Sequence, residues 1–284
     1  MKVVLFCGGL GLRLREFSEH LPKPMVPIGS HPILWHIMKY YAYYGHKDFI
    51  LCLGFGAQIV KNYFLNYNEC LSNDFVLSQG GKHLELFSSD IDDWNITFVD
   101  SGIHSNIGQR LKAVEKYLGN DEVFLANYSD GLTNLPLPEQ IEHFRQQQKI
   151  ASFLCVIPNL SSHFVSFSED GVVQAIDNVR AADLRINGGY FVFHRDIFRY
   201  MHEGEELVQE PFQRLVAQQQ VIAYKYDGFW AAMDTFKDRQ QLEELCARGN
   251  APWEVWKLPL ETRTSALPRT LALSPLLHRG EIKA

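Results

Sequence analysis

The chain has 284 residues, of which 46% are hydrophobic and 21% are charged, so it has the composition of a globular protein with a sizeable core. That composition excludes the disordered, collagen-like and disulfide-scaffold classes. With 27 Lys and Arg against 33 Asp and Glu, the formal net charge is -6, which excludes a broad basic surface for nucleic acid. We therefore expect any phosphate to be bound locally.

In chain order, the pattern first predicts a strand at 3–7, a helix from Pro32 to Gly45, a strand at 48–55 and a helix at 58–65. Ser30 can cap the first of these helices. The pattern then predicts a strand at 96–99, a helix at 107–118, a strand at 122–126, a helix from about 138 and a strand at 151–157. This alternation indicates a parallel sheet. From about His163, short alternating segments at 165–167, 172–176 and 189–193 predict strands mixed into the sheet or appended to it, where they could wall a pocket.

The region after Trp256 has prolines among scattered Leu, Thr and Arg and no sustained periodicity. We expect residues 258–284 to be a loosely ordered tail or a segment that docks on a partner subunit, which leaves 1–257 as the folded domain. The five cysteines are widely spaced and form no C-x-x-C pair, so neither a disulfide framework nor a zinc site is predicted. No apolar stretch approaches the roughly 20 residues that span a bilayer, and the strand-like run at the start leads us to expect no signal sequence. We expect a cytoplasmic protein with no membrane partner.

The run GGLGLRL at residues 8–14 directly follows the first predicted strand. Glycines let backbone N–H groups approach an anion closely, and Arg13 adds a fixed positive charge. The run is no G-x-x-x-x-G-K-[ST] loop, and Leu14 stands where the dinucleotide-binding fingerprint has its third glycine. A merely structural tight turn explains the glycines alone equally well.

Lys23 lies between Pro22 and Pro24, which present it on a stiff segment. That arrangement suits a phosphate clamp, and a solvated lysine in a proline-bounded loop is the alternative.

Two aspartates are candidate ligands for a hard cation. Asp130 follows the predicted strand at 122–126, and a carboxylate at the end of a parallel strand points into the crevice where α/β sheets bind ligands. Asp234 precedes a helix predicted from about Phe236. The alternatives are an Asx turn at Asp130 and a helix cap at Asp234 or Thr235. Sequence spacing cannot bring the two carboxylates together, and only the fold could do so.

Together these motifs resemble the nucleotidyltransferase family that makes nucleotide sugars from a nucleoside triphosphate and a sugar 1-phosphate. Four motifs occur in the same order along the chain as in the family: the glycine run, K-P-M at 23–25, the strand ending in Asp130-Gly131 and I-N-G-G at 186–189. The chain is most similar to the cytidylyltransferase branch of the family. That similarity rests on segments at 32–38, 94–100, 110–112, 229–230, 233–235 and 251–253.

The resemblance implies a Rossmann-like three-layer α/β/α fold of GT-A type, with a mixed, mainly parallel sheet and additional β segments around an acceptor pocket. It implies that residues 1–257 form the catalytic domain of a homo-oligomer. The implied reaction is Mg2+-dependent transfer of CMP from CTP to glucose 1-phosphate or a close relative, which releases pyrophosphate and forms a CDP-sugar. Because the acceptor phosphate is already ionised, the site must mainly position and neutralise charge.

The resemblance also implies the site residues. The residues that it assigns to nucleotide binding are Gly8, Gly9, Gly11, Arg13, Lys23 and Arg110. Those that it assigns to catalysis are Arg13, Lys23 and Asp130. It assigns Asp130 and Asp234 as the ligands of Mg2+. The residues that it assigns to acceptor binding are Asn178, Arg180, Asn187 and Gly188.

Two departures from the family leave the acceptor open. Leu12 stands where the family has Thr or Ser, and Asp177-Asn178-Val179 replaces an E-K-P segment whose lysine contacts the acceptor phosphate. A lost charge-assisted contact is worth roughly 1.5 to 3 kcal/mol, which Arg180 could restore. The alternatives are the same transfer onto a different phosphorylated or phosphonate acceptor, or a non-catalytic nucleotide-binding protein.

Overall fold

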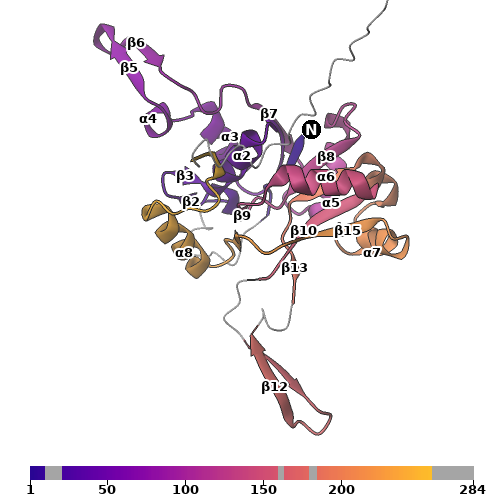
Figure 1. Cartoon of the computed structure of the whole chain (residues 1–284). Coiled ribbons are helices and arrows are strands. Elements are labelled where there is room, and N and C mark those ends of the chain that lie inside the picture. Colours follow the sequence, from indigo (N-terminus) through magenta and orange to yellow (C-terminus); the bar gives the residue numbers. More distant parts are fainter. Residues whose placement is uncertain (10–20, 159–162, 179–183, 258–284) are drawn as a thin grey trace, which may run out of the picture.

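A mixed sheet forms the centre of the computed structural model, which describes residues 1–9, 21–158, 163–178 and 184–257 (Figure 1). Its strands are β1 (Val3–Phe6), β4 (Asp48–Leu53), β7 (Asn95–Asp100), β8 (Val123–Asn127), β10 (Ala151–Val156), β13 (Ile186–Asn187), β14 (Phe191–His194) and β15 (Val221–Tyr226). The order is β13-β10-β14-β8-β1-β4-β7, with β15 beside β10. Strands β8, β1, β4 and β7 run parallel, and β14 is antiparallel to both β8 and β10.

Helices cover both faces of this sheet. The first layer contains α2 (Ile33–Tyr43), α3 (Ala57–Leu65) and α6 (Leu137–Gln147), and the second contains α5 (Ile107–Val114), α7 (Glu210–Ala217) and the 3-10 helix η5 (Arg195–Tyr200). Successive side chains of β1 alternate between the layers, with Val3 and Leu5 in one apolar cluster and Val4 and Phe6 in the other. The three-layer architecture and the mainly parallel sheet are therefore confirmed.

The predicted central strands form because their apolar runs are buried on both faces. Val3, Val4 and Leu5 have no exposed surface, and full burial of each side chain is worth about 1.5–3 kcal/mol. The carboxyl ends of the parallel strands β1 and β8 are thereby fixed side by side, which places the segments after them next to each other.

The predicted cap of the first helix is wrong. Helix α2 begins at Ile33 with Pro32 before it and no capping side chain. Ser30 lies in the turn between two short antiparallel strands, β2 (Pro27–Ile28) and β3 (His31–Pro32), and its hydroxyl contacts His31 Nδ1 at 2.8 Å. The pairing of β2 with β3 is a tertiary feature that the helical pattern did not reveal.

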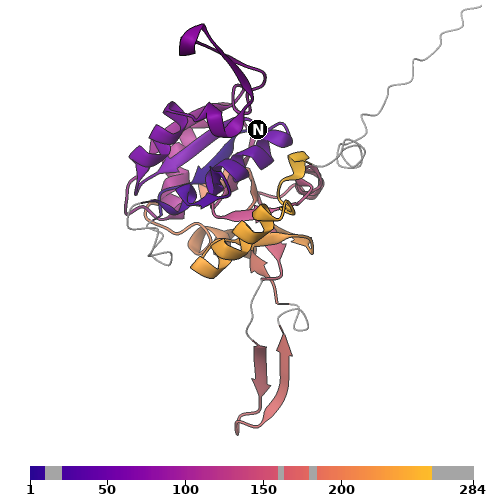
Figure 2. The same ribbon diagram turned by 90° about the vertical axis from the view of Figure 1, so that its left-hand side faces the viewer.

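The remaining strands form separate two-stranded sheets. Strand β9 (Gly131–Thr133) pairs with β16 (Trp230–Ala232) beside the ends of the parallel strands. Two hairpins, β5 (Phe75–Ser78) with β6 (His83–Leu86) and β11 (His163–Phe167) with β12 (Val173–Asn178), stand clear of the body in both views (Figures 1 and 2). The predicted strands at 165–167 and 172–176 thus form a projecting hairpin, whereas 189–193 overlaps β14 in the central sheet.

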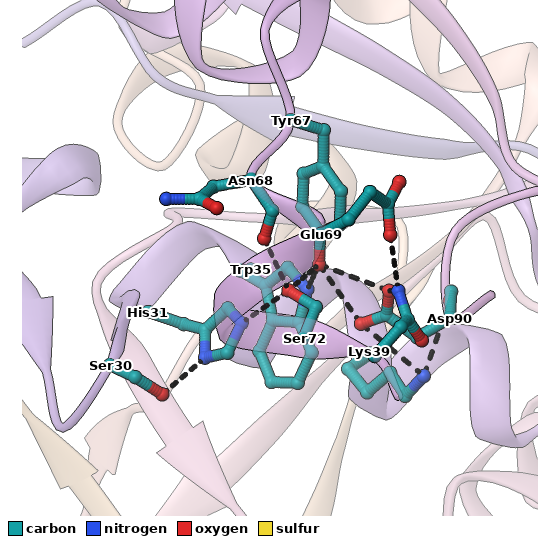
Figure 3. Close-up of polar contacts among 10 residues, drawn as sticks. Ser30, His31, Trp35, Lys39, Tyr67, Asn68, Glu69, Ser72 and Asp90 are labelled. Carbon is teal, nitrogen blue, oxygen red and sulfur yellow. Dashed lines mark hydrogen bonds and ion pairs between the residues drawn. The ribbon is translucent and has the colours of Figure 1, made fainter. Parts of the chain in front are cut away.

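A polar cluster fastens α2 to the short helix α4 (Glu69–Ser72), which precedes the β5–β6 hairpin (Figure 3). Trp35 Nε1 donates to the Tyr67 hydroxyl at 2.8 Å, and that hydroxyl donates to Asp90 at 2.9 Å. Further bonds join the Ser72 hydroxyl to the Tyr67 hydroxyl and to His31 Nε2, each at 3.0 Å. We call this set the α2 cluster; its members are His31, Trp35, Lys39, Tyr67, Ser72 and Asp90.

The end of the described chain packs on α2 as well. Trp253 is buried and donates from Nε1 to His36 Nδ1 at 3.2 Å, and the ring of Trp256 meets that of Trp35 edge-on. These contacts hold the segment after helix α8 (Phe236–Ala247) on the body, and α8 itself is tied to β2 by a bond from Arg239 Nε to Pro27 O at 3.2 Å. Residues 258–284 lie outside the described residues, so the boundary at 257 stays a prediction. In the ranges that the structure covers, no helix is long and apolar enough to cross a membrane.

Candidate active site

A cavity of about 730 Å³ opens where β1 and β8 end. Its lining includes residues from the turn after β1, the segment after β8 and the start of α5. Of the predicted site residues, Gly9, Lys23, Arg110, Asp130 and Asp234 all line it. The cavity is large enough for a nucleotide-sized ligand.

Three charged side chains from distant segments meet in this cavity. Lys23 Nζ donates to Asp130 Oδ2 at 2.7 Å and to Asp234 Oδ1 at 2.6 Å. Lys23 begins the 3-10 helix η2 (Lys23–Met25), which is bounded by Pro22 and held by a bond from Met25 N to Pro22 O at 2.8 Å. We call Lys23, Asp130 and Asp234 the site triad.

The pairing of β9 with β16 brings the two aspartates together. Asp130 immediately precedes β9, and Asp234 follows β16 by two residues. Ala232 is the register partner of Gly131, and Met233 N donates to Asp130 O at 2.9 Å. The fold therefore supplies the proximity that sequence spacing could not.

Burial and pairing act in opposite directions on the charges of the site triad. The Lys23 side chain is 16% exposed. Burial lowers the pKa of Lys23, but the charges of Asp130 and Asp234 and their hydrogen bonds outweigh it, so its pKa lies above the ordinary value. Burial raises the pKa of Asp130, and the charge of Lys23 opposes that rise.

The residue before Asp130 was not predicted to have a role. Ser129 is fully buried, has a left-handed φ of 62°, and donates from its hydroxyl to Phe6 O at 2.7 Å. Such a backbone costs about 1–3 kcal/mol and persists only where surrounding contacts impose it. The bond to β1 fixes the turn that aims Asp130 at the cavity. Its only sequence signal is its position between a buried strand and an Asp-Gly dipeptide.

The glycine turn has a structural partner in Arg110, which is 2% exposed. Arg110 donates to Gly8 O at 2.9 Å, to Ser101 Oγ at 2.8 Å and to Leu53 O at 3.2 Å. A Cβ on Gly8 would lie 1.9 Å from the guanidinium, so glycine is required there to make room for it. Gly9, in contrast, would meet no heavy atom within 4 Å and faces the open cavity. Contact of Arg110 with a nucleotide phosphate stays a prediction.

The amino end of α5 forms another wall that sequence reasoning missed. Ser105, Asn106 and Ile107 line the cavity, and Asn106 caps the helix by accepting from Gln109 N at 2.8 Å. Glu206 also lines the cavity and accepts from Ile107 N at 3.3 Å. Asn106 and Gln109 form a reciprocal capping box, a signal that was readable in the sequence.

The predicted acceptor residues are only partly placed. Asn187 donates from Nδ2 to the Tyr128 hydroxyl at 3.2 Å, and Tyr128 lines the cavity. Gly188 accepts from Trp230 Nε1 at 2.9 Å. Neither residue is among the described residues that line the cavity. Gly11, Arg13 and Arg180 lie outside the described residues, and Asn178 is described only as the last backbone position of β12.

The two aspartates of the site triad are oxygen ligands suited to a hard divalent cation. Both carboxylate oxygens contact one nitrogen, so they lie close enough together to share a single cation. Within the described ranges no group of three or more His, Cys, Asp and Glu could hold a metal. Two carboxylates alone fit Mg2+, which fills its other positions with water and substrate phosphate oxygens.

The fold and the cavity define an α/β protein with a ligand-sized cavity at the carboxyl edge of its sheet. The chain belongs to the nucleotidyl transferase family, which it matches over residues 2–239. It is therefore an enzyme of the nucleotidyltransferase class, as the sequence predicted.

Curated relatives and solved structures agree with this assignment. The chain is 36% identical to the glucose-1-phosphate cytidylyltransferases of Salmonella typhi and Salmonella typhimurium over 258 residues, which cover 90% of this chain and 100% of each relative. Its fold is similar to that of a UDP-glucose pyrophosphorylase complexed with UDP-glucose, with a TM-score of 0.64, 15% identity, and coverage of 87% of this chain and 98% of that one. The predicted family and fold are confirmed.

Proposed function

We propose that the chain is an Mg2+-dependent cytidylyltransferase that transfers CMP from CTP to glucose 1-phosphate or a closely related sugar 1-phosphate. An acceptor phosphate oxygen forms a bond to the α-phosphorus of CTP. The bond from that phosphorus to the bridging oxygen breaks, and pyrophosphate leaves with the electron pair. The products are a CDP-sugar and pyrophosphate, and nothing is oxidised or reduced.

One observation carries the proposal. Lys23 meets Asp130 and Asp234 in a single cavity, in a chain that aligns along the whole length of curated cytidylyltransferases. Nucleotidyl transfer needs positioning and charge neutralisation rather than an acid or a base, and this cavity offers those groups.

The chain's own residues divide the work. Asp130 and Asp234 would hold Mg2+, which when bound neutralises phosphate charge and orients the triphosphate. Lys23 supplies a mobile positive charge at the same place. Gly9 lines the cavity, and Arg110 holds the residue before it by donating to Gly8 O.

The acceptor is the open part of the proposal. Asp177 and Asn178 replace the family's glutamate and lysine, and both belong to the projecting strand β12. This replacement favours a second candidate, the same transfer onto another phosphorylated or phosphonate acceptor. Arg180 is the residue that we expect to replace the missing lysine.

The test is a panel of pyrophosphate-release assays that crosses CTP, ATP, GTP and UTP with glucose 1-phosphate, other sugar 1-phosphates and phosphonate acceptors. We expect release with CTP and a sugar 1-phosphate, abolished by chelation of Mg2+. Preference for another nucleotide would overturn the cytidylyl assignment. Release only with a different acceptor class would establish the second candidate. Absence of release across the panel, with CTP still bound, would contradict both.

We also propose that the chain forms a homo-oligomer through its β11–β12 hairpin. One face of β11–β12 carries Val165, Phe167, Val173 and Ile176, with exposed fractions of 46%, 65%, 53% and 64%. An isolated two-stranded sheet is marginal in water, so this apolar face needs a partner. Light scattering coupled to gel filtration checks the proposal; a monomer at micromolar concentration contradicts it, and Phe167→Ser should shift an oligomer toward smaller species.

A further inference from the structure

We propose that Lys23 occupies the cation position of the substrate-free protein, so that Lys23 and the divalent cation compete for Asp130 and Asp234. This inference rests on the proposed function, because it assigns those aspartates to the cation. The triphosphate releases the lysine by offering its Nζ other oxygens, and cation and nucleotide therefore enter as a pair.

The geometry leaves room for one cation between the two carboxylates. Lys23 Nζ lies 2.7 Å from Asp130 Oδ2 and 2.6 Å from Asp234 Oδ1. A magnesium ion needs its oxygen ligands at about 2.0–2.1 Å. An ammonium group that contacts both oxygens at these distances would therefore overlap a divalent cation held by the same two carboxylates, and the two positive charges would exclude each other.

Lys23 also accounts for the closeness of the two aspartates. Two neighbouring carboxylates repel each other, and the ammonium group between them offsets that repulsion. The Asp130 and Asp234 side chains are 26% and 44% exposed, so water alone screens them only in part. Lys23 thus keeps the site assembled before substrate arrives.

The exchange requires only the side chain of Lys23 to move. Pro24 and Met25 are buried and Pro22 precedes them, so the backbone of this segment is held. The side chain is a flexible four-carbon stem, and its Nζ can turn into the cavity that Gly9 and Arg110 also line. A triphosphate in that cavity would offer it stronger anionic partners.

The test measures Mn2+ binding to the substrate-free protein by electron paramagnetic resonance. Lys23→Met should bind Mn2+ about tenfold more tightly than the wild type, since a tenfold change needs only about 1.4 kcal/mol of lost competition. Asp130→Asn should bind it more weakly than either. Equal or weaker binding by Lys23→Met would overturn the proposal.

Lys112→Met is the control for a general charge effect, because it removes a positive charge of α5 that is paired with Glu115 and is not among the described residues that line the cavity. We expect its Mn2+ affinity to change less than about threefold, which is a small part of the tenfold gain. A gain as large as that of Lys23→Met would also overturn competition, because it would show that any loss of positive charge suffices.

A second measurement uses the wild-type protein, so it does not depend on whether a variant folds. In crystals soaked with Mn2+ and α,β-methylene-CTP, Nζ should have left both aspartates for phosphate oxygens. Mn2+ bound while Nζ still bridges both carboxylates would refute the exchange. Neither measurement depends on turnover. If the assay panel shows that the enzyme uses a different nucleotide or acceptor, the cytidylyl assignment is wrong, but the Mn2+ measurements still decide whether lysine and cation compete.

Discussion

The site triad and the α2 cluster are both polar groups placed among buried elements, but they differ in what satisfies them. In the α2 cluster, Tyr67 links Trp35 and Asp90 through hydrogen bonds between neighbouring elements (Figure 3). In the site triad, one ammonium group serves two carboxylates beside a cavity of about 730 Å³. A network closed on itself stabilises a fold, whereas charges beside an open cavity are available to a ligand. We therefore expect substitutions in the two places to have separable effects.

The largest expected effect is the loss of turnover in Asp130→Asn. The variant should lower kcat/KM for pyrophosphate release by about 10² to 10³-fold, because an amide cannot neutralise a cation. Its free energy of unfolding should change little, since Lys23 keeps Asp234 as a partner. Asp93→Asn, which removes a surface carboxylate paired with Lys47, is the matched control and should leave kcat/KM unchanged. If the activity of Asp130→Asn were within a few-fold of wild type, Asp130 would not be needed for turnover, and the predicted difference between the two regions would be wrong.

Arg110 should combine both kinds of effect, because it lines the cavity and also holds three strand ends together. Arg110→Met should lower the free energy of unfolding by about 3 kcal/mol through the loss of its bonds to buried oxygens. It should also raise the KM for CTP by about tenfold by loosening the turn at Gly8. Urea unfolding and steady-state kinetics on one preparation check this. A loss of stability with an unchanged KM would show that the turn does not depend on the arginine.

Beside the α2 cluster, His36 should make stability depend on pH. Burial lowers the pKa of His36 to about 4 from its ordinary 6.5. Between these values the unfolded chain binds more protons than the folded chain, so the free energy of unfolding falls as the pH drops from about 6.5 to 4. The contribution of His36 amounts to about 3 kcal/mol over that window.

His36→Gln isolates this contribution, because His31 and His46, whose pKa values are also lowered by burial, remain in the variant. Urea unfolding at a series of pH values should show a smaller pH dependence for His36→Gln than for wild type. Identical pH dependence would assign the acid sensitivity to other groups.

The smallest expected effect is that of Tyr67→Phe within the α2 cluster. Loss of the hydroxyl leaves Trp35 Nε1 and Asp90 without that partner, which should lower the free energy of unfolding by about 1–3 kcal/mol. The kcat/KM should stay unchanged. Tyr117→Phe is the matched control at a side chain that is 39% exposed, and we expect it to be near neutral. A large loss of activity in Tyr67→Phe would show that the two regions are coupled.

The sequence predicted the central strands and helices well because their apolar periodicity is set by burial, as in β1 and α2. It also identified Lys23, Asp130 and Asp234 as candidates, since each lies beside a proline or at the end of an element. It could not predict that they meet, because this depends on the pairing of β9 with β16 across about a hundred residues of chain. The cap at Ser30 failed for a similar reason, because the pairing of β2 with β3 took that residue into a turn.

Two further features were beyond sequence reasoning because they are relations between distant atoms. The left-handed backbone of Ser129 is imposed by its bond to β1. The need for glycine at position 8 comes from a guanidinium that arrives from α5. A glycine run after a strand suggested phosphate binding, and one of its glycines turns out to accommodate a side chain of the protein itself.

The pairing of Gly131 with Ala232 has a consequence for how the chain can vary. Because the paired strands β9 and β16 bring Asp130 and Asp234 together at their ends, the spacing of the two aspartates does not depend on the β11–β12 hairpin that lies between them in the sequence. Exchange of that hairpin can therefore leave the spacing of the two carboxylates unchanged.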